Sequence, residues 1–310
     1  MRIISKNLLV FCNIIMLLRD FYFIIEIKMN FVMTGHRGLI GSFLLKRLTE
    51  RGDKPVLLVD KREGKDIAGI NSFKLEEEAS VMYHLAAFCK INQSIENPQR
   101  VFEDNVSGTH EVLEFCRRNG IGKIVFTSSS RVLSKEKNPY TASKVYGEEL
   151  VRGYHDCYGI DYSIISPSTV YGPFNDLTGR LVDIFILNAL RGEELKIYGD
   201  KDKTLDFTYV DDFVNGLLIA SEQRNSSFVI SSGKSERVSD VADMIIGLAG
   251  KGRKAFYHSE TAQPQNVNLD ISQIGTFGYT PRVFAREGIT RTFDWYKNNL
   301  DEIMNSRAVQ

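Results

Sequence analysis

An apolar run, a glycine-rich turn and an amphipathic stretch follow one another over residues 31–50, and this order predicts an α/β fold. Short apolar runs and helical patterns continue to alternate after it, as in a parallel sheet buried on both faces. We therefore predict a Rossmann-type, doubly wound parallel sheet, with a dinucleotide-binding domain at residues 29–166. From Pro167 the chain is looser and richer in glycine. Residues 167–310 are predicted to form mainly a smaller C-terminal α/β substrate lobe that partly returns to the main sheet.

The turn reads TGHRGLIG and has the glycine spacing of a dinucleotide-binding loop. Gly35 allows the tight turn, Gly38 lets the backbone approach a pyrophosphate, and Gly41 lets helix and strand pack closely. The following helix begins near Leu39 and Ile40, and its free N–H groups carry partial positive charge. These residues are therefore the predicted phosphate contacts.

The next predicted strand, residues 55–59, ends at Asp60. An acidic side chain here accepts hydrogen bonds from the adenosine ribose and repels the additional phosphate of NADP. The neighbouring cations Arg37, Lys61 and Arg62 would instead bind that phosphate. The sequence favours NAD as the cofactor, with NADP as the alternative.

A candidate catalytic set lies in the stretch TSSSRVLSKEKNPYTASK. Tyr140 and Lys144 are four residues apart, so a helix would present the phenol and the ammonium group on one face. A nearby cation stabilises a phenolate and lowers the pKa of the phenol, whose ordinary value is about 10. Ser129 would hydrogen-bond the same substrate oxygen. These three residues are what proton transfer to or from an alcohol requires while a hydride leaves its carbon.

Together these motifs resemble the extended short-chain dehydrogenase/reductases, specifically the NAD-dependent nucleotide-sugar epimerase/dehydratase family. The resemblance runs from about Met29 to the C-terminus. It also rests on these blocks: Asp66-Ile67, HLAA at 84–87, NVSGT at 105–109, IVFTSSS at 124–130, PSTVYGP at 167–173, IYGD at 197–200 and LDFTYVDD at 205–212. The resemblance implies that Ser129, Tyr140 and Lys144 are catalytic.

The resemblance also implies the remaining contacts. The cofactor would be contacted by Asp66, Ile67, Ala86, Ala87, Asn105, Tyr140, Lys144 and Pro167. The substrate would be contacted by Ser129, Thr169 and Lys203. It further implies a homodimer formed through the helix near residues 105–119 and the Tyr140 helix.

Several positions depart from the family pattern. Two arginines that usually bind the substrate pyrophosphate are replaced, one by Leu205 and one within residues 263–268. Lys203, Arg180 or Arg191 are the candidate replacements. The acidic pair of the dehydratases is replaced by Ser130 and Arg131, which disfavours a 4,6-dehydratase.

Composition narrows the class of protein. The 310-residue chain has a net charge of zero and no basic stripe, which disfavours nucleic-acid binding. Its four cysteines and five histidines show no metal-ligand spacing, so we expect no metal and reduced thiols in a cytoplasmic enzyme.

The first 28 residues carry apolar runs interrupted by Arg19 and Asp20. No uninterrupted run reaches the roughly 20 residues that a membrane helix needs. Because Met29 directly precedes the first predicted strand, we expect a start codon placed too far upstream or a dispensable extension. A membrane anchor is the alternative, although we expect no membrane association.

The leading functional hypothesis is an NAD-dependent nucleotide-sugar epimerase of the 4-epimerase type that acts through a transient keto-sugar. The first alternative is an NAD(P)H-dependent 4-keto-sugar reductase, which needs the same residues. The second is a non-catalytic nucleotide-binding or scaffold protein, which would have no need of the complete Ser-Tyr-Lys set.

Overall fold

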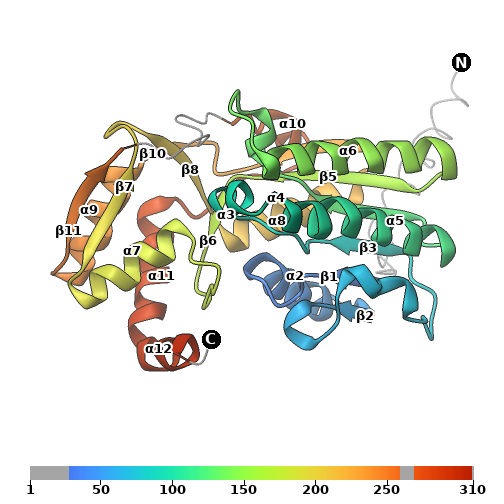
Figure 1. The fold of residues 1–310 in the computed structure, drawn as a ribbon, viewed down its shortest axis with the longest axis horizontal. Coiled ribbons are helices and arrows are strands. Elements are labelled where there is room, and N and C mark those ends of the chain that lie inside the picture. The colour runs from blue at the N-terminus through green and yellow to red at the C-terminus, as the bar shows by residue number, and fades with distance from the viewer. Residues whose placement is uncertain (1–27, 259–268, 309–310) are drawn as a thin grey trace, which may run out of the picture.

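The computed structural model describes residues 28–258 and 269–308. The predicted extension therefore lies outside the described residues except for Lys28, as does the replaced arginine position within residues 263–268. Two bodies of secondary structure lie side by side, and the larger contains most of the first half of the chain (Figure 1). Among the described residues, no helix combines the length and apolarity that crossing a membrane requires.

The larger body is organised around a six-stranded sheet in which all neighbouring strands are parallel. In spatial order the strands are β2 (Lys54–Val59), β1 (Asn30–Thr34), β3 (Val81–His84), β4 (Lys123–Thr127), β5 (Asp161–Pro167) and β9 (Ser226–Ile230). The chain moves outward from β1 to β2 and then crosses to β3 on the other side of β1. Ligands bind beyond the carboxyl ends of the strands at such a switch point. The predicted doubly wound parallel sheet is confirmed.

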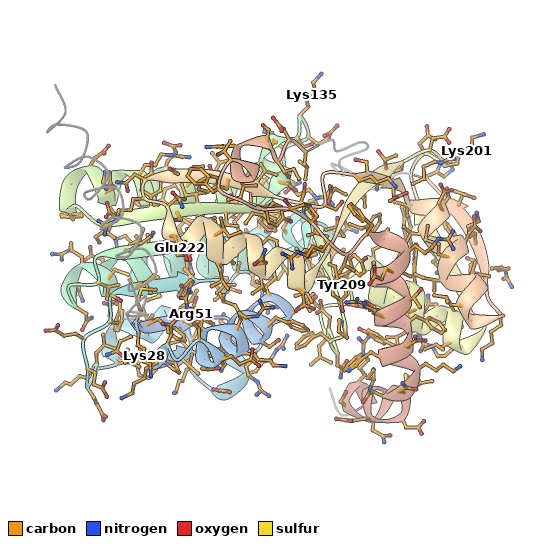
Figure 2. All side chains as sticks on the ribbon, turned by 180° about the vertical axis from the view of Figure 1, so that it is seen from behind. Lys28, Arg51, Lys135, Lys201, Tyr209 and Glu222 are labelled. Atoms are coloured by element: carbon orange, nitrogen blue, oxygen red, sulfur yellow. The ribbon has the colours of Figure 1, made fainter. Side chains whose placement is uncertain are left out.

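Alternate side chains of the strands enter two separate cores. Phe31 and Met33 of β1 pack with α2 (Leu39–Glu50) and α8 (Val210–Glu222), whereas Val32 belongs to the core under α5 (Gly108–Arg118) and α6 (Pro139–Tyr158). Figure 2, seen from behind, shows α8 lying across the first of these faces, with Glu222 at its carboxyl end. Both faces are covered by helices, which explains why the strands are continuous apolar runs.

The helix expected over residues 105–119 is longer and less regular than predicted. It starts with α4 (Pro98–Val101), continues through a π-helical turn, η3 (Phe102–Ser107), and becomes α-helical only at α5. Asn105 lies buried in the π-helical turn. Its side-chain oxygen accepts the Phe88 N–H at 2.7 Å, and its amide nitrogen donates to Phe88 O at 3.0 Å and Ser143 Oγ at 2.9 Å. The turn thus ties the loop after β3 to α6.

Helix α6 has strong signals at both ends. Asn138 forms a capping box with Thr141, Pro139 occupies the first turn, and Gly159 ends the helix with a φ of 70°. These signals fix where the helix begins, and therefore fix Tyr140 and Lys144 within its first two turns.

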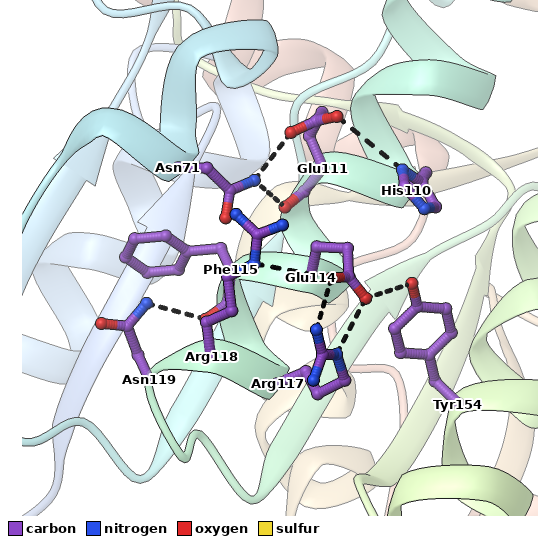
Figure 3. A network of polar contacts seen from close by, with 9 residues as sticks. All are labelled: Asn71, His110, Glu111, Glu114, Phe115, Arg117, Arg118, Asn119 and Tyr154. Carbon is purple, nitrogen blue, oxygen red and sulfur yellow. Dashed lines mark hydrogen bonds and ion pairs between the residues drawn. The ribbon is translucent and has the colours of Figure 1, made fainter.

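A polar network joins α5 to both neighbours (Figure 3). Glu114 accepts hydrogen bonds from Arg117 Nε at 3.0 Å and from the Tyr154 hydroxyl of α6 at 2.7 Å. On the other side, Asn71 of η2 (Ile67–Ser72) donates to the backbone oxygen of Glu111 at 2.9 Å. The contacts hold α5 and α6 together on one face of the sheet.

The smaller body has its own core. Its strands form a three-stranded sheet in the order β10 (Ser235–Arg237), β8 (Thr204–Tyr209), β6 (Thr169–Tyr171) and a parallel pair, β7 (Glu194–Tyr198) and β11 (Arg253–Tyr257). Its main helices are α7 (Leu181–Arg191), α9 (Val238–Ala249), α11 (Ala285–Asn298) and α12 (Leu300–Ala308). Between them in sequence, α8 and β9 belong to the main sheet and its covering layer. The division into domains at residue 166 stays a prediction.

Candidate active site

A cavity of about 790 Å³ lies beyond the carboxyl ends of the central strands. At one end it is lined by residues that follow β1, β2 and β3, and at the other by residues of α7, β7 and β8. It therefore connects the glycine turn with the smaller body.

Most of the predicted cofactor residues line this cavity. They are Gly35, Gly38, Ile40, Asp60, Ile67, Ala86, Ala87, Tyr140, Lys144 and Pro167. Gly35 has a φ of +78°, and a Cβ at this position would lie 2.6 Å from Ala86 N. Only glycine fits there, because the backbone of the turn after β1 meets the backbone of the loop after β3. This close-packed cradle at the start of α2 fits a dinucleotide.

Four predicted cofactor residues do not line the cavity but support its wall. Leu39 packs into the core beneath α2. A Cβ on Gly41 would lie 2.2 Å from Gly35 O, so this glycine lets α2 approach the turn. Asp66 accepts the Ala68 N–H at 3.1 Å and caps η2. Asn105 holds the loop after β3, as described above.

Asp60 is fixed by backbone contacts at the end of β2. Its two side-chain oxygens accept the Arg37 N–H at 2.9 Å and the Arg62 N–H at 3.0 Å. The Arg62 guanidinium in turn donates to Arg37 O at 2.7 Å. The Asp60 carboxylate is therefore fixed at the cavity wall. Arg62, one of the cations that could bind the additional phosphate of NADP, is held at the same wall by the Arg37 carbonyl.

Asp60→Ala should weaken NAD binding about tenfold or more and weaken NADP binding less, because charge-assisted hydrogen bonds are worth about 1.5–3 kcal/mol. Titration of both cofactors by fluorescence or calorimetry measures the two affinities. Asp301→Ala, on exposed α12, removes the same charge far from the cavity and serves as the control. Tighter binding of NADP than of NAD by the wild-type protein would show that the three cations outweigh Asp60.

The structure brings the three predicted catalytic residues to one place on the cavity wall. Ser129 stands just after β4 and before the short helix η4 (Ser130–Leu133), whereas Tyr140 and Lys144 lie on α6. All three are buried. Lys144 Nζ donates to Thr127 O at 2.8 Å, which fixes the ammonium group at the end of β4.

Burial and several neighbouring groups act on the phenol of Tyr140. Burial raises the pKa of the Tyr140 phenol, while the side chain of Ser129 and the positive charges of Arg180 and Arg131 act in the opposite direction. The two arginines are therefore cations near the phenol that the sequence motif did not point to. The effect of Lys144 on the pKa of Tyr140 stays a prediction.

Lys144 is itself perturbed. Burial lowers the pKa of its ammonium group to about 8 from an ordinary value of 10.5, against the opposing effects of Cys89 and Glu148. In the unfolded chain the lysine keeps its proton up to about pH 10.5, so the unfolded state binds more protons between about pH 8 and 10.5. The free energy of unfolding from this group therefore rises with pH across that window.

Lys144→Met should remove this rise and increase stability at pH 7, since one pKa unit corresponds to about 1.4 kcal/mol. Urea denaturation from pH 7 to 9.5 compares the two proteins. Lys135→Met, on the exposed loop before α6, is the matched control and should retain the wild-type slope. Parallel curves for wild type and Lys144→Met would contradict the prediction.

At the substrate end, Thr169 and Lys203 both line the cavity, as does Leu205. The Lys203 ammonium donates to Tyr198 O at 3.4 Å. Of the other candidate replacements, Arg180 lines the cavity, whereas Arg191 contacts Asn188 and does not. Lys203 as the substitute for the lost arginines stays a prediction.

Sequence reasoning missed several cavity residues. Lys90, in the loop after β3, donates to Gly179 O at 2.7 Å, and Lys196 lies on β7 over the ring of Tyr257. Neither belongs to a motif, so only their position in space identifies them. With them the cavity is lined by these cations: Lys61, Arg62, Lys65, Lys90, Arg131, Lys144, Arg180, Lys196 and Lys203. The lining carboxylates are Asp60 and Asp104, so the cavity is suited to a strongly anionic ligand.

The described residues contain no cluster of three or more histidine, cysteine, aspartate or glutamate side chains that would hold a metal ion.

The sequence is similar to a known family and to named proteins. The model of the NAD dependent epimerase/dehydratase family matches residues 31–231. A putative UDP-glucose 4-epimerase of Methanocaldococcus jannaschii is 32% identical over 86% of this chain and 98% of its own length. A UDP-glucose 4-epimerase of Mycolicibacterium smegmatis is 29% identical over 87% of this chain and 99% of its own.

The fold is also similar to that of solved structures. The UDP-glucose 4-epimerase of Thermotoga maritima, solved with UDP-glucose, matches with a TM-score of 0.78 at 26% identity, covering 88% of this chain and all of that one (100%). The match to the family extends over more than half of the chain, and the first relative exceeds 30% identity over most of both proteins. The chain therefore belongs to the NAD-dependent epimerase/dehydratase family and is an NAD-dependent enzyme of the extended short-chain dehydrogenase/reductase type.

Proposed function

We propose that this enzyme is a nucleotide-sugar 4-epimerase that acts through a transient 4-keto-sugar. The observation that carries the proposal is the placement of Ser129, Tyr140 and Lys144 together in a cation-rich cavity that begins at the glycine turn. Relatives named as UDP-glucose 4-epimerases support the same reaction. Because NAD is recycled in an epimerase, no second redox substrate is needed.

NAD, held by the glycine turn and the Asp60 side of the cavity, would supply a reversible hydride acceptor for the sugar carbon. Tyr140 takes the proton of the sugar hydroxyl. It returns the proton after the keto-sugar has rotated and presents its other face. Ser129 hydrogen-bonds the same oxygen, which holds it in line with the phenol. Lys144, fixed by Thr127 O, lines the wall between these residues and the glycine turn. The glycine turn at the start of α2 would hold the dinucleotide in the same cavity that Ser129, Tyr140 and Lys144 line.

A 4-keto-sugar reductase would use the same three residues, with Tyr140 donating its proton. The dehydratases of the family carry an acidic pair where this chain has Ser130 and Arg131, so a dehydration reaction is disfavoured. The experiment that separates the remaining candidates is product NMR after incubation with UDP-, dTDP-, GDP- and CDP-sugars. An epimerase converts one C4 epimer into the other without net change in NAD. Product formation only with stoichiometric consumption of NADH or NADPH would favour the reductase.

We also propose that the enzyme is a homodimer formed through the helix that runs from η3 into α5, and through α6. This face carries the exposed apolar side chains Phe102 and Tyr146, and a shallow groove of about 600 Å³ lies between them. Large exposed apolar side chains that gather on one face mark an interaction surface.

Phe102→Glu combined with Tyr146→Glu should convert the dimer to a monomer in light-scattering measurements. Phe256→Glu, at an exposed position on β11, is the control and should leave the mass unchanged. A wild-type protein that is monomeric at micromolar concentration would contradict this proposal.

A further inference from the structure

Arg131 is a cation of the cavity wall whose charge is left unmatched. It lies on η4, directly after β4, and lines the cavity with Ser129 and Tyr140. Its backbone N–H donates to Ser129 Oγ at 3.2 Å. Within residues 28–258 and 269–308, its guanidinium makes no hydrogen bond, ion pair or ring contact. A fork of five donors therefore faces the cavity without an acceptor from the protein.

Three other cations of the cavity have polar partners in the protein. Arg180 Nε pairs with Asp176 at 2.9 Å, Lys61 pairs with Asp104 at 2.5 Å, and Lys144 donates to the Thr127 carbonyl. Arg131 differs from them although it lies in the same enclosed space. The Arg131 side chain is partly buried in the cavity wall, and burial lowers the pKa of its guanidinium. An anion that enters with the substrate would relieve the cost of burying this charge.

The anion would have to come from the reacting end of the substrate. Arg131 lies two residues after Ser129, donates its backbone N–H to the Ser129 hydroxyl, and lines the same cavity as Tyr140, so it belongs to the end of the cavity that holds the proposed catalytic residues. Both cavity carboxylates, Asp60 and Asp104, lie at the cofactor end. The cations suited to a pyrophosphate, Lys196 and Lys203, lie on β7 and before β8 in the smaller body. Arg131 on one side, and Lys196 with Lys203 on the other, could therefore bind two separate anionic groups of one substrate.

We propose that the substrate is a nucleotide-linked hexuronate and that Arg131 binds the carboxylate of its sugar ring. This inference rests on the proposed nucleotide-sugar function. A carboxylate matches a guanidinium with two parallel charge-assisted hydrogen bonds. The hydroxymethyl group of a neutral hexose offers a single neutral acceptor in the same place, so Arg131 would remain poorly matched.

The test compares UDP-glucuronate with UDP-glucose on the NAD-loaded enzyme, by calorimetric affinity and by steady-state kinetics. The wild-type enzyme should favour UDP-glucuronate about 10- to 100-fold in kcat/KM, the scale of a charged hydrogen-bonded pair. Arg131→Gln should bring this ratio close to one, mainly through a higher KM for the uronate. Arg131→Lys should give an intermediate ratio, because it keeps the charge and loses the fork.

Lys135→Gln is the matched control. Lys135 lies four residues after Arg131, just beyond η4, and its side chain points outward from the molecule (Figure 2). It should leave the ratio unchanged. Because Arg131 has no protein partner to lose, Arg131→Gln should melt at or above the wild-type temperature.

The other outcomes overturn the inference. A wild-type preference for UDP-glucose, or a ratio that Arg131→Gln leaves unchanged, would remove the carboxylate role while 4-epimerisation of UDP-glucose would still support the proposed function. An equal fall in turnover on both sugars would mean that Arg131 serves Tyr140 and not the substrate. Failure of every nucleotide sugar to bind would overturn the proposed function and this inference together.

Discussion

Tyr140→Phe should reduce turnover by about 10²-fold or more, the scale expected when a general acid–base is removed. The variant keeps the aromatic ring and loses only the hydroxyl, which is the proposed proton carrier. The position is buried, and the charges of Arg131 and Arg180 act on it. Stopped-flow or NMR measurement of kcat on the accepted nucleotide sugar provides the test.

The same variant should fold normally and bind NAD with nearly the wild-type affinity. Tyr158→Phe, near the end of the same helix and exposed, changes the same atom outside the cavity and should leave kcat unaltered. Near-normal turnover by Tyr140→Phe would exclude this phenol as the proton carrier.

Gly35→Ala should weaken NAD binding at least tenfold and lower the free energy of unfolding by about 3 kcal/mol. Two effects combine. An alanine pays about 1–2 kcal/mol for the left-handed conformation, and its Cβ meets the backbone of Ala86, which cannot move without shifting the loop after β3. That loop lines the cofactor end of the cavity.

Gly64→Ala separates the two effects. Gly64 has a φ of +72°, but a Cβ there would meet nothing within 4 Å. The control should therefore show only the conformational cost and leave cofactor binding almost intact. Urea denaturation and NAD titration of both variants make the comparison. Equal effects of the two substitutions would mean that the close approach to Ala86 has no importance for the site.

Much of the cofactor half was predictable because its signals are local. The glycine turn lies between a strand and a helix that are adjacent in the chain, and Asp60 ends the next strand. Tyr140 and Lys144 are one helical turn apart, so their common face follows from helix geometry alone. The capping signals around Asn138 and Pro139 also lie beside the residues they position. The helix with the π-helical turn was less predictable, because Asn105 is held by contacts with Phe88 and Ser143.

The sequence by itself determined the doubly wound sheet and the dinucleotide turn, and it singled out Ser129, Tyr140 and Lys144. Each of these features depends on residues that lie close together along the chain. Only the tertiary structure decided which charges share the cavity. In it Lys144 donates to the Thr127 carbonyl, Arg180 lines the same cavity as Tyr140, and among the described residues the Arg131 guanidinium has no side-chain or backbone acceptor. The physical reason is that solvation and ion pairing depend on distance in space. Tyr140 and Arg180 are 40 residues apart in the chain, and only the folded structure places both at one cavity.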